Sequence, residues 1–362
     1  MEIFVTSLGT SWAGSTAVID KQALKKNLAW LKERSKTDKA IAVVKANFYG
    51  HGAIEAARTL ESDVEQFAVA TIDEAIQLRR GGIELPILVL GVPHKNASAV
   101  YKEYDLTASV SQLNHFELLE DGTEFHVVID TGMRRLGIFP SQLDKLKKKL
   151  NEEDSRLVCR GVFSHYATAE DPGSDFVHLQ NERFQQVRAS LPIDLDFHMS
   201  NSPAVIHYDI DHFDAIRVGI GLTGYAPGRV QTDSLEPILT WQTELVQVRP
   251  ISKGDTVSYE GSWRAPEDGY LGTLPVGYAD GVSRMLSNRL EVRIDDKYYS
   301  QVGNVTMDYT MIFLRDNKLK EGSKVDLIGG GGWRADRWAR EAGTITHEII
   351  CGLSERVRRE YR

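Results

Sequence analysis

The sequence predicts an α/β fold: a (β/α)8 TIM barrel followed by a mostly antiparallel β domain. Three observations support this fold class. Short apolar runs alternate with amphipathic segments through roughly the first two-thirds of the chain, as parallel βαβ units require. About eight such runs are present, which is the number of strands that closes a parallel barrel. Beyond that part, apolar strands are separated by Gly, Asp and Pro, a pattern typical of antiparallel sheets.

The first expected element is a helix that begins after Asp20. An aspartate at this position can accept hydrogen bonds from the free amides of a first helical turn. Ala23, Leu24, Leu28 and Leu31 follow at the spacing of one helix face. This segment therefore predicts a helix with one buried side.

Eight strands are expected to form the barrel, with helices between most of them. Their predicted ranges are 41–45, 67–70, 87–90, 106–110, 125–130, 157–164, 195–199 and 215–218. The segment Thr71-Ile-Asp-Glu74 is a capping-box pattern that begins one of the helices. A doubly wound open sheet is built from the same alternation and is the structural alternative.

The change of pattern predicts a domain boundary near residue 237. We expect a barrel over residues 1–236 and a β domain over residues 237–362, with the first residues of the chain as further candidates for the β domain. The strands of the β domain are expected at 239–248, 270–276, 290–294, 298–302, 310–314 and 324–328.

Composition and charge exclude several classes of partner. The net charge of −8 over 362 residues does not favour a nucleic acid. No apolar run is long enough to cross a bilayer, and the N-terminus does not look like a signal peptide. Cys159 and Cys351 lie far apart with no CxxC pattern, which favours a reducing, cytoplasmic location and gives no reason to expect a metal site.

The segment from Ile41 to Gly52 reads as a buried strand that ends in a lysine. It delivers Lys45 to the end of an apolar run, followed by a Tyr-Gly-His-Gly turn. A lysine at a strand end often only extends to water. A lysine held at the mouth of a site can instead react with an aldehyde. The residue pattern alone leaves both interpretations open.

Polar, glycine-containing segments follow several other predicted strands. They are Asp130 to Arg135, Ser164 to Tyr166, Ser200 to Ser202 and Arg217 to Ile220. In a (β/α)8 barrel the functional groups lie where the strands end, at one face. We therefore expect these segments to lie together with Lys45.

The pattern V-V-K-A-N-x-Y-G-H-G around Lys45 resembles the segment that carries pyridoxal phosphate in the alanine racemase family. Further matches follow in order: Asp130 to Gly137, His165, His198 to Ser202, Arg217 to Ile220, Val257-Ser-Tyr259, Gly277 to Gly281 and Met307-Asp308. The resemblance covers nearly the whole chain. It implies a barrel with a C-terminal β domain, pyridoxal 5'-phosphate as cofactor, a small amino acid as substrate, and a homodimer with shared active sites.

The resemblance also implies two opposed bases. Lys45 carries the cofactor and serves as one base, while Tyr259 of the partner subunit is the other. Taken alone, Tyr259 is an ordinary aromatic residue of a β domain, so its motif carries the assignment. Arg217 matches the arginine that faces the pyridine nitrogen; because an arginine holds its proton firmly, the ring remains a weak electron sink.

The remaining site residues are implied by the same matches. His165 accompanies Arg217 as a polarising group near the cofactor. The residues implied for phosphate binding are Tyr49, Asn201, Ser202, Gly219 and Ile220. Arg135 matches the arginine that binds the substrate carboxylate, and Met307 of the partner subunit is expected to narrow the pocket.

Three positions depart from the family pattern. Val128 stands where many members have a lysine that orients the arginine, Arg134 replaces a usual glycine, and Glu355 replaces a usual tyrosine. Arg134 is a candidate second carboxylate contact or a solvent-exposed charge. Glu355 would repel phosphate, so we expect it to point away or to meet a cation such as Arg356. Our hypothesis is that racemisation is preserved while substrate choice broadens or shifts.

The leading interpretation is an amino-acid racemase acting on alanine. The alternatives are a racemase of another amino acid such as serine, a related barrel-fold decarboxylase, and a cofactor-carrying or regulatory protein without turnover. Arg217 disfavours the strong electron sink that decarboxylation needs. The β domain with Tyr259 and Met307 argues against the third alternative, since such relatives are often the barrel alone.

Overall fold

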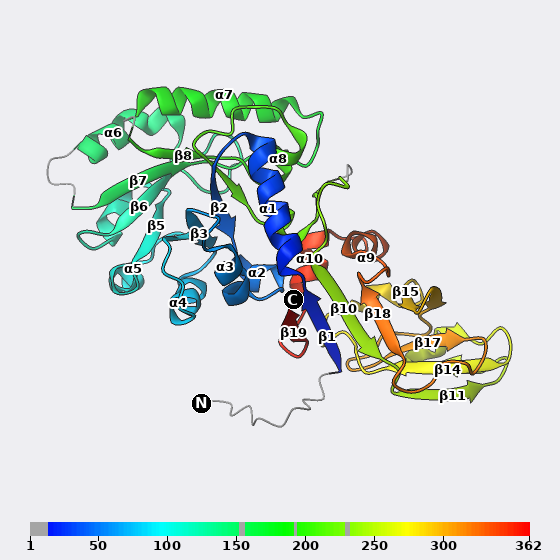
Figure 1. Cartoon of the computed structure of the whole chain (residues 1–362). Coiled ribbons are helices and arrows are strands. Elements are labelled where there is room, and N and C mark those ends of the chain that lie inside the picture. The colour runs from blue at the N-terminus through cyan, green and yellow to red at the C-terminus, as the bar shows by residue number, and fades with distance from the viewer. Residues whose placement is uncertain (1–13, 152–155, 192–193, 229–231) are drawn as a thin grey trace. The chain divides into compact units, whose positions relative to one another are not determined.

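The computed structural model describes residues 14–151, 156–191, 194–228 and 232–362 (Figure 1). It divides into two compact units. One unit runs from Asp20 to Ile238, and the other combines the described residues 14–19 with Leu239 to Arg362.

The first unit is a closed barrel of parallel strands. The strands are β2 (Lys39–Val43), β3 (Gln66–Val69), β4 (Ile87–Val89), β5 (Leu106–Val110), β6 (Glu124–Val128), β7 (Val158–Phe163), β8 (Asp196–His198) and β9 (Ala215–Val218). Because β2 pairs in parallel with both β3 and β9, the sheet closes on itself. The predicted barrel is confirmed, and the open doubly wound sheet is wrong.

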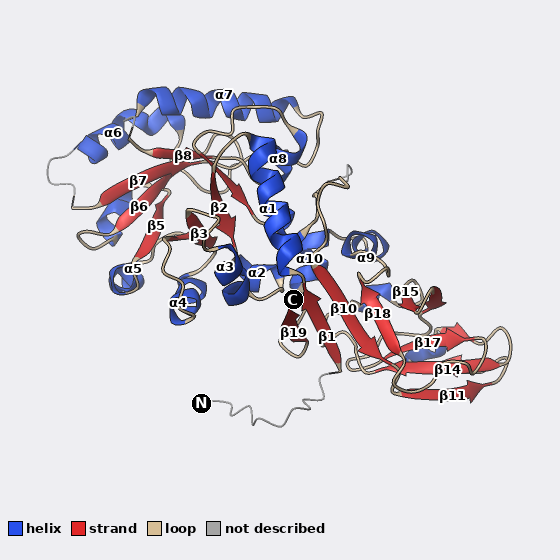
Figure 2. Ribbon diagram, viewed as in Figure 1, coloured by secondary structure: helices blue, strands red, loops and turns tan. Residues whose placement is uncertain are grey.

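Helices connect most of the barrel strands, as Figure 2 shows. They are α2 (Lys45–Tyr49), α3 (Ala53–Leu60), α4 (Ile72–Arg80), α5 (Ser98–Glu103), α6 (Leu143–Asn151), α7 (Asp175–Ser190) and α8 (Ser202–His207). A further helix, α1 (Lys21–Ser35), precedes β2. The short 3-10 helix η4 (Ile220–Thr223) follows β9. These connections place a loop at the carboxyl end of every barrel strand, where a site can form.

The start of α1 confirms the expected cap. Asp20 Oδ1 accepts hydrogen bonds from the amides of Gln22 and Ala23 at 2.8 and 2.9 Å. Leu24, Leu28 and Leu31 are buried. The capped end and the apolar stripe together fix where this helix begins and which side faces the barrel.

The barrel interior is a packed apolar core. The side chains that fill it come from most of the strands: Ile41, Val43, Ala68, Leu88, Val128, Phe163 and Ala215 form one buried cluster. Branched and aromatic side chains of this kind fill the interior of a small barrel and leave no pore. A small molecule can therefore bind only at the ends of the strands.

The second unit is built from three sheets. A six-stranded sheet has the order β16-β15-β18-β10-β1-β19, beside a three-stranded sheet β11-β14-β17 and a two-stranded sheet β12-β13. The strands are β1 (Ser15–Ile19), β10 (Leu239–Glu244), β11 (Gln247–Ile251), β12 (Thr256–Val257), β13 (Trp263–Arg264), β14 (Gly269–Leu274), β15 (Glu291–Ile294), β16 (Lys297–Ser300), β17 (Thr310–Leu314), β18 (Lys324–Ile328) and β19 (Arg358–Tyr361). Two helices, α9 (Ala335–Ala342) and α10 (Thr346–Cys351), lie between β18 and β19 in the sequence. The predicted β domain is confirmed.

One predicted strand of this unit is wrong in extent. The range 239–248 is divided into β10 and β11, which belong to different sheets. The chain leaves the first sheet after Glu244, and β11 then pairs with β14 through Gln247 opposite Thr273. A continuous apolar alternation thus conceals a change of sheet.

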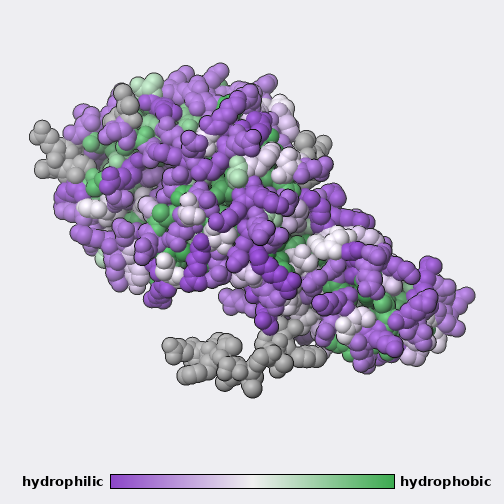
Figure 3. All heavy atoms as spheres, viewed as in Figure 1, coloured by the Kyte–Doolittle hydropathy of each residue, from purple (hydrophilic) through white to green (hydrophobic). Residues whose placement is uncertain are grey.

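The surface is largely hydrophilic on the face shown in Figure 3. Within the described ranges, no helix is long and apolar enough to cross a membrane.

Candidate active site

The segment after Lys45 adopts an unusual backbone conformation. Lys45 comes directly after the last pairing of this segment with β3, in which the Val44 amide donates to the Ala68 carbonyl at 2.9 Å. The next four residues, Ala46 to Tyr49, all have φ between 50° and 52°. Such left-handed conformations cost L-residues about 1–2 kcal/mol each. A strained turn of this kind persists only where neighbouring groups hold it.

Several groups hold the turn in place. The Asn47 side-chain oxygen accepts a hydrogen bond from the Ala53 amide at 2.9 Å. The buried His51 ring nitrogen Nδ1 lies 3.0 and 2.9 Å from the carbonyl oxygens of Phe48 and Tyr49. These contacts connect the turn to α3 and fix the half-buried Lys45 at the carboxyl end of the barrel.

Arg217 is the central charge of the site. Its guanidinium donates to His198 Nδ1 at 2.8 Å, to His165 Nδ1 at 2.9 Å and to the Ser164 carbonyl at 2.8 Å. It also lies over the Phe163 ring, 5.0 Å from the centroid. All of these partners are neutral, and among the described residues no carboxylate pairs with Arg217. Burial, followed by the nearby charge of Arg135, lowers the pKa of Arg217 to about 10.

The histidines around Arg217 are held neutral. Burial is the first cause that lowers the pKa of His165, followed by the charges of Arg217, Arg135 and Lys45. Burial and Arg217 also lower the pKa of His198 well below its ordinary value. Because Arg217 can only donate, both histidines accept through Nδ1 and carry their proton on Nε2. His165 therefore presents an N–H at Nε2.

His126 extends this network into the barrel. Its Nδ1 lies 2.9 Å from His198 Nε2, so the proton of His198 is donated to His126. His126 was not predicted from the sequence to be a site residue, and His198 was predicted only as the first residue of a matched motif. The available signal was a histidine inside a strand, β6, whose other residues are mostly apolar.

We expect the buried histidines to make the protein less stable in acid. Burial lowers the pKa of His126 from 6.5 to about 4, so this histidine stays neutral in the folded chain while its unfolded form takes up a proton. The free energy of unfolding should therefore fall as the pH drops from about 6.5 to about 4, by on the order of a few kcal/mol. Urea unfolding of the parent and of His126→Gln at several pH values measures this, and the variant should show a shallower decline. Equal declines would contradict the assignment.

The expected phosphate-binding residues lie close together. Ser202 Oγ accepts hydrogen bonds from the amides of Gly219 and Gly221, both at 3.1 Å, which leaves its own proton to donate. A Cβ on Gly219 would lie 2.2 Å from the Tyr49 hydroxyl, so only glycine allows this close approach. Ile220 begins η4, where first-turn amides have no partner within the helix. These donors suit a phosphate group.

Asn201 also caps a helix. Its side-chain oxygen accepts from the Ala204 amide at 3.1 Å and so begins α8. Its amide nitrogen consequently faces His165 Nε2 at 3.4 Å. With the proton of His165 on Nε2, both facing nitrogens are donors, so Asn201 lies beside the Arg217 network without a hydrogen bond to His165.

Arg135 lies near this network without a partner in it. Its charge lowers the pKa of both His165 and Arg217, yet its guanidinium makes no hydrogen bond or ion pair with any residue that the structure describes. Val128 lies in the apolar barrel core and cannot orient it. An exposed, unpaired guanidinium at this position is available to a carboxylate ligand.

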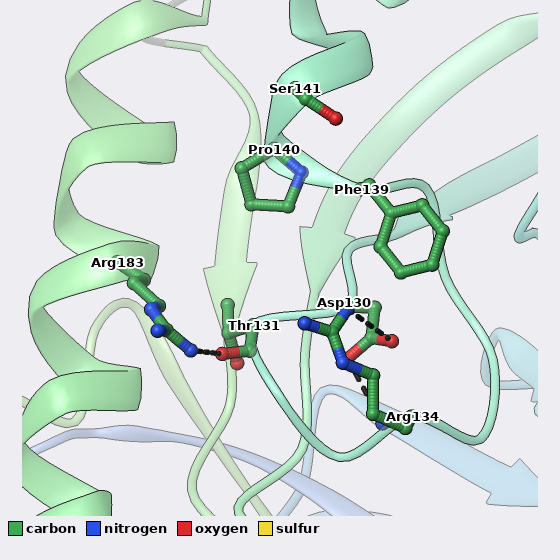
Figure 4. Close-up of a pocket in the computed structure, with 7 residues that line it drawn as sticks. All are labelled: Asp130, Thr131, Arg134, Phe139, Pro140, Ser141 and Arg183. Carbon is green, nitrogen blue, oxygen red and sulfur yellow. Dashed lines mark hydrogen bonds and ion pairs between the residues drawn. The ribbon is translucent and has the colours of Figure 1, made fainter.

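Arg134 is directed to neighbouring side chains. Its Nη1 lies 3.6 Å from Asp130 Oδ2, and its guanidinium stacks on Phe139 with 5.1 Å between the charge centre and the ring centroid. Figure 4 shows the contact with Asp130, in a pocket that Phe139 and Arg183 also line. Asp130 Oδ1 further accepts from the amides of Gly132 and Arg134. Arg134 is therefore part of the loop structure. Its side chain is largely exposed, as one alternative expected, and the carboxylate it contacts is that of Asp130.

We expect the usual glycine to be tolerated at position 134. Arg134 has φ of 60°, so Arg134→Gly relieves strain of about 1–2 kcal/mol. That relief offsets the loss of an exposed ion pair and a cation–π contact, each worth up to about 1 kcal/mol. Arg134→Ala loses the same contacts and keeps the strain. Urea unfolding should show Arg134→Ala less stable than Arg134→Gly by about 1 kcal/mol; the opposite order would show that the contacts outweigh the strain.

The candidate residues of the β domain lie in the second unit. Tyr259 is 72% exposed and Met307 is 52% exposed. Tyr259 is flanked by Ser258 and Glu260, both with φ of 64°, and its carbonyl accepts from Asn304 at 3.0 Å. The backbone is thus held in a specific shape while the phenol points outward.

Glu355 is exposed. We expected it either to point away or to meet Arg356, and it does not pair with Arg356. Arg356 instead forms ion pairs with Asp280 at 3.3 Å and Asp308 at 2.8 Å. These two carboxylates belong to segments that matched the family pattern. Among the described residues, no group of three or more His, Cys, Asp or Glu side chains could hold a metal ion.

Comparison with known proteins identifies the family. The model of the alanine racemase N-terminal domain matches residues 19–227, and that of the alanine racemase C-terminal domain matches residues 238–361. The chain belongs to the alanine racemase family. The alanine racemase of Symbiobacterium thermophilum is 37% identical to it, over 95% of this chain and 96% of that protein.

Solved alanine racemase structures share the whole fold. That of Clostridium difficile 630 has a TM-score of 0.91 at 30% identity and covers 98% of this chain, with 97% of its own length matched. The enzyme of Bartonella henselae, described with covalently bound pyridoxal phosphate, has a TM-score of 0.86 at 29% identity, over 96% of this chain and 99% of that chain. The similarity therefore includes both domains.

Proposed function

We propose that this chain is an alanine racemase that interconverts L- and D-alanine with pyridoxal 5'-phosphate as its cofactor. The observation that carries the proposal is the match to alanine racemases over both domains. The local geometry supports it, because the charges of Lys45, Arg135 and Arg217 all lie close enough to His165 to lower its pKa. A decarboxylase or a racemase of serine is not favoured by the relatives.

The barrel residues suit the cofactor. Lys45 is the amine that holds it, and Ser202 with the amides of η4 and the Tyr49 hydroxyl would hold its phosphate. Arg217, a buried cation with only neutral partners, would face the ring nitrogen. When bound, pyridoxal phosphate withdraws electrons from the substrate's α carbon and so makes its proton removable.

Two side chains then transfer the α proton, one on each face of the substrate. Lys45 holds or accepts the α proton on one face of the substrate, and Tyr259 of the partner subunit does so on the other. Arg135 binds the carboxylate, and the unpaired guanidinium suits two oxygens at once. Arg217 and His165 supply positive charge and an N–H that stabilise negative charge developing nearby.

A homodimer follows because the two bases of one site come from different subunits. Tyr259 and Met307 are exposed in the single chain, as residues should be that complete the site of a second copy. A two-fold dimer then contains two equivalent shared sites. The two free cysteines agree with a reducing, cytoplasmic location.

Chiral analysis of purified protein supplied with the cofactor tests this function. L-alanine and D-alanine should each be converted to the racemic mixture, and the rate should depend on added pyridoxal phosphate. Serine and larger or charged amino acids test the second part of our hypothesis, that Val128, Arg134 and Glu355 broaden or shift substrate choice. No turnover of alanine would contradict the function, while strict preference for alanine would contradict only the altered specificity.

A further inference from the structure

The carboxylate of Glu74 binds three backbone amides from two loops. Oε2 accepts from the amides of Ala70 and Thr71 at 2.7 and 3.2 Å. Oε1 accepts from the Ala46 amide at 2.6 Å. Glu74 lies in the first turn of α4, so one side chain connects the loop after β3 to the loop after β2.

A helix cap explains only one side of this carboxylate. The capping box consists of the Thr71 hydroxyl accepting from the Glu74 amide at 3.3 Å and the Glu74 side chain accepting from the Thr71 amide. That arrangement confirms the pattern expected from the sequence and uses Oε2 alone. The bond from Oε1 to Ala46, across 28 residues of sequence, adds nothing to the cap.

The amide that Oε1 binds belongs to the peptide bond between Lys45 and Ala46. It opens the strained left-handed turn from Ala46 to Tyr49. An amide bonded to an ionised carboxylate forms a shorter and stronger hydrogen bond than one bonded to a neutral acceptor. Because a peptide is planar, holding the Ala46 amide also fixes the orientation of the Lys45 carbonyl group.

We propose that Glu74 is a positioning residue for Lys45. Its carboxylate fixes the Lys45–Ala46 peptide, stabilises the left-handed turn and so sets the direction in which the Lys45 side chain points. Glu74 reaches Lys45 only through the backbone. The inference rests on the proposed function for the role of Lys45, and extends it by naming the group that orients this residue.

Three variants separate positioning from capping. Glu74→Ala removes both the cap and the bond to Ala46. Thr71→Ala is the matched control, because it removes the hydroxyl of the cap and leaves the bond from Oε1 to the Ala46 amide. Glu74→Gln keeps an oxygen that can accept from Ala46 without the charge, and should fold even where the alanine variant does not.

Two measurements on the cofactor-loaded enzyme test the proposal. The first is hydrogen–deuterium exchange of the peptide that contains Lys45 to Gly52, and the second is kcat for alanine in both directions. Glu74→Ala should speed the exchange of this peptide and lower kcat by about 10- to 100-fold, as a small misplacement of a reacting group does. Glu74→Gln should be intermediate. Thr71→Ala should resemble the parent in both measurements while its thermal midpoint falls.

The outcomes distinguish this inference from the proposed function. Equal exchange of the Lys45 peptide in Glu74→Ala and Thr71→Ala, with kcat unchanged relative to the control, would overturn the positioning role. If the parent does not racemise alanine, the proposed function fails, but faster exchange of that peptide in Glu74→Ala alone still supports the clamp on the turn.

Discussion

Replacing Lys45 with alanine should lower the rate of alanine racemisation by about 10²–10⁴-fold, the usual contribution of a positioned acid–base group. The variant should also lose the visible absorbance of the lysine-bound cofactor, because the amine that binds the cofactor is then missing. The charge of Lys45 acts on His165, so its loss also removes one of the causes that keep that histidine neutral. Absorbance spectra and chiral analysis of the same preparation measure both effects.

Lys39→Ala is the matched control for this experiment. Lys39 begins β2, the strand that precedes Lys45, and forms an exposed ion pair with Asp196 at 2.7 Å, so its loss should cost little stability and no activity. Adding a small amine to Lys45→Ala should restore part of the turnover, since the amine can substitute for the missing base. A Lys45→Ala enzyme with the parent's absorbance and rate would show that this lysine neither holds the cofactor nor acts as a base.

The barrel could be predicted because its signal is local. Each of its strands is a short apolar run, and the packed interior requires that pattern wherever the strand lies. Asp20 and Thr71 gave correct helix starts for the same reason, since a cap is a contact between near neighbours. The polar segments at the ends of the strands then followed from topology.

The β domain was less predictable because its pairing depends on distant segments. The strand β1 pairs with β10, where Ser15 lies opposite Thr243, and nothing near Ser15 in sequence signals that partner. The range 239–248 looked like one strand because apolar alternation continues past Leu245. Only the separate partners of β10 and β11 reveal the change of sheet.

Two features of the candidate site also lay beyond the sequence. The left-handed turn from Ala46 to Tyr49 consists of residues that ordinarily avoid this conformation, and it depends on tertiary contacts such as that of Glu74. Arg134 adopts a positive φ where glycine would be free of strain, so its contacts with Asp130 and Phe139 had no local signal. Both features are cases in which packing overrides local preference.

Replacing Tyr259 with phenylalanine should lower racemisation by about 10²–10⁴-fold while the bound cofactor keeps its absorbance. The phenol is 72% exposed in the single chain, so removing one oxygen should not disturb folding. With two bases on opposite faces, the variant should still exchange the α proton of one enantiomer with deuterium from solvent. It should lose exchange for the other enantiomer, whose proton faces the missing phenol.

Tyr298→Phe is a suitable control for this prediction. Tyr298 is also exposed, and its hydroxyl donates to the Gly331 carbonyl at 2.8 Å, apart from the Val257-Ser-Tyr259 motif in sequence. It should racemise alanine at the parent's rate. If Tyr259→Phe exchanges the α protons of both enantiomers as fast as the parent, the assignment of Tyr259 as the second base is wrong.

A mixture of the two inactive variants tests whether the site is shared between subunits. In a dimer of one Lys45→Ala chain and one Tyr259→Phe chain, one site lacks both bases and the other has both. Random reassortment of a two-fold dimer should therefore restore about a quarter of the parent's activity. Bases contributed by the same chain would give no recovery, because every site would then lack one of them. Recovery after mixing would show that Tyr259 completes the site that contains Lys45 of the other chain.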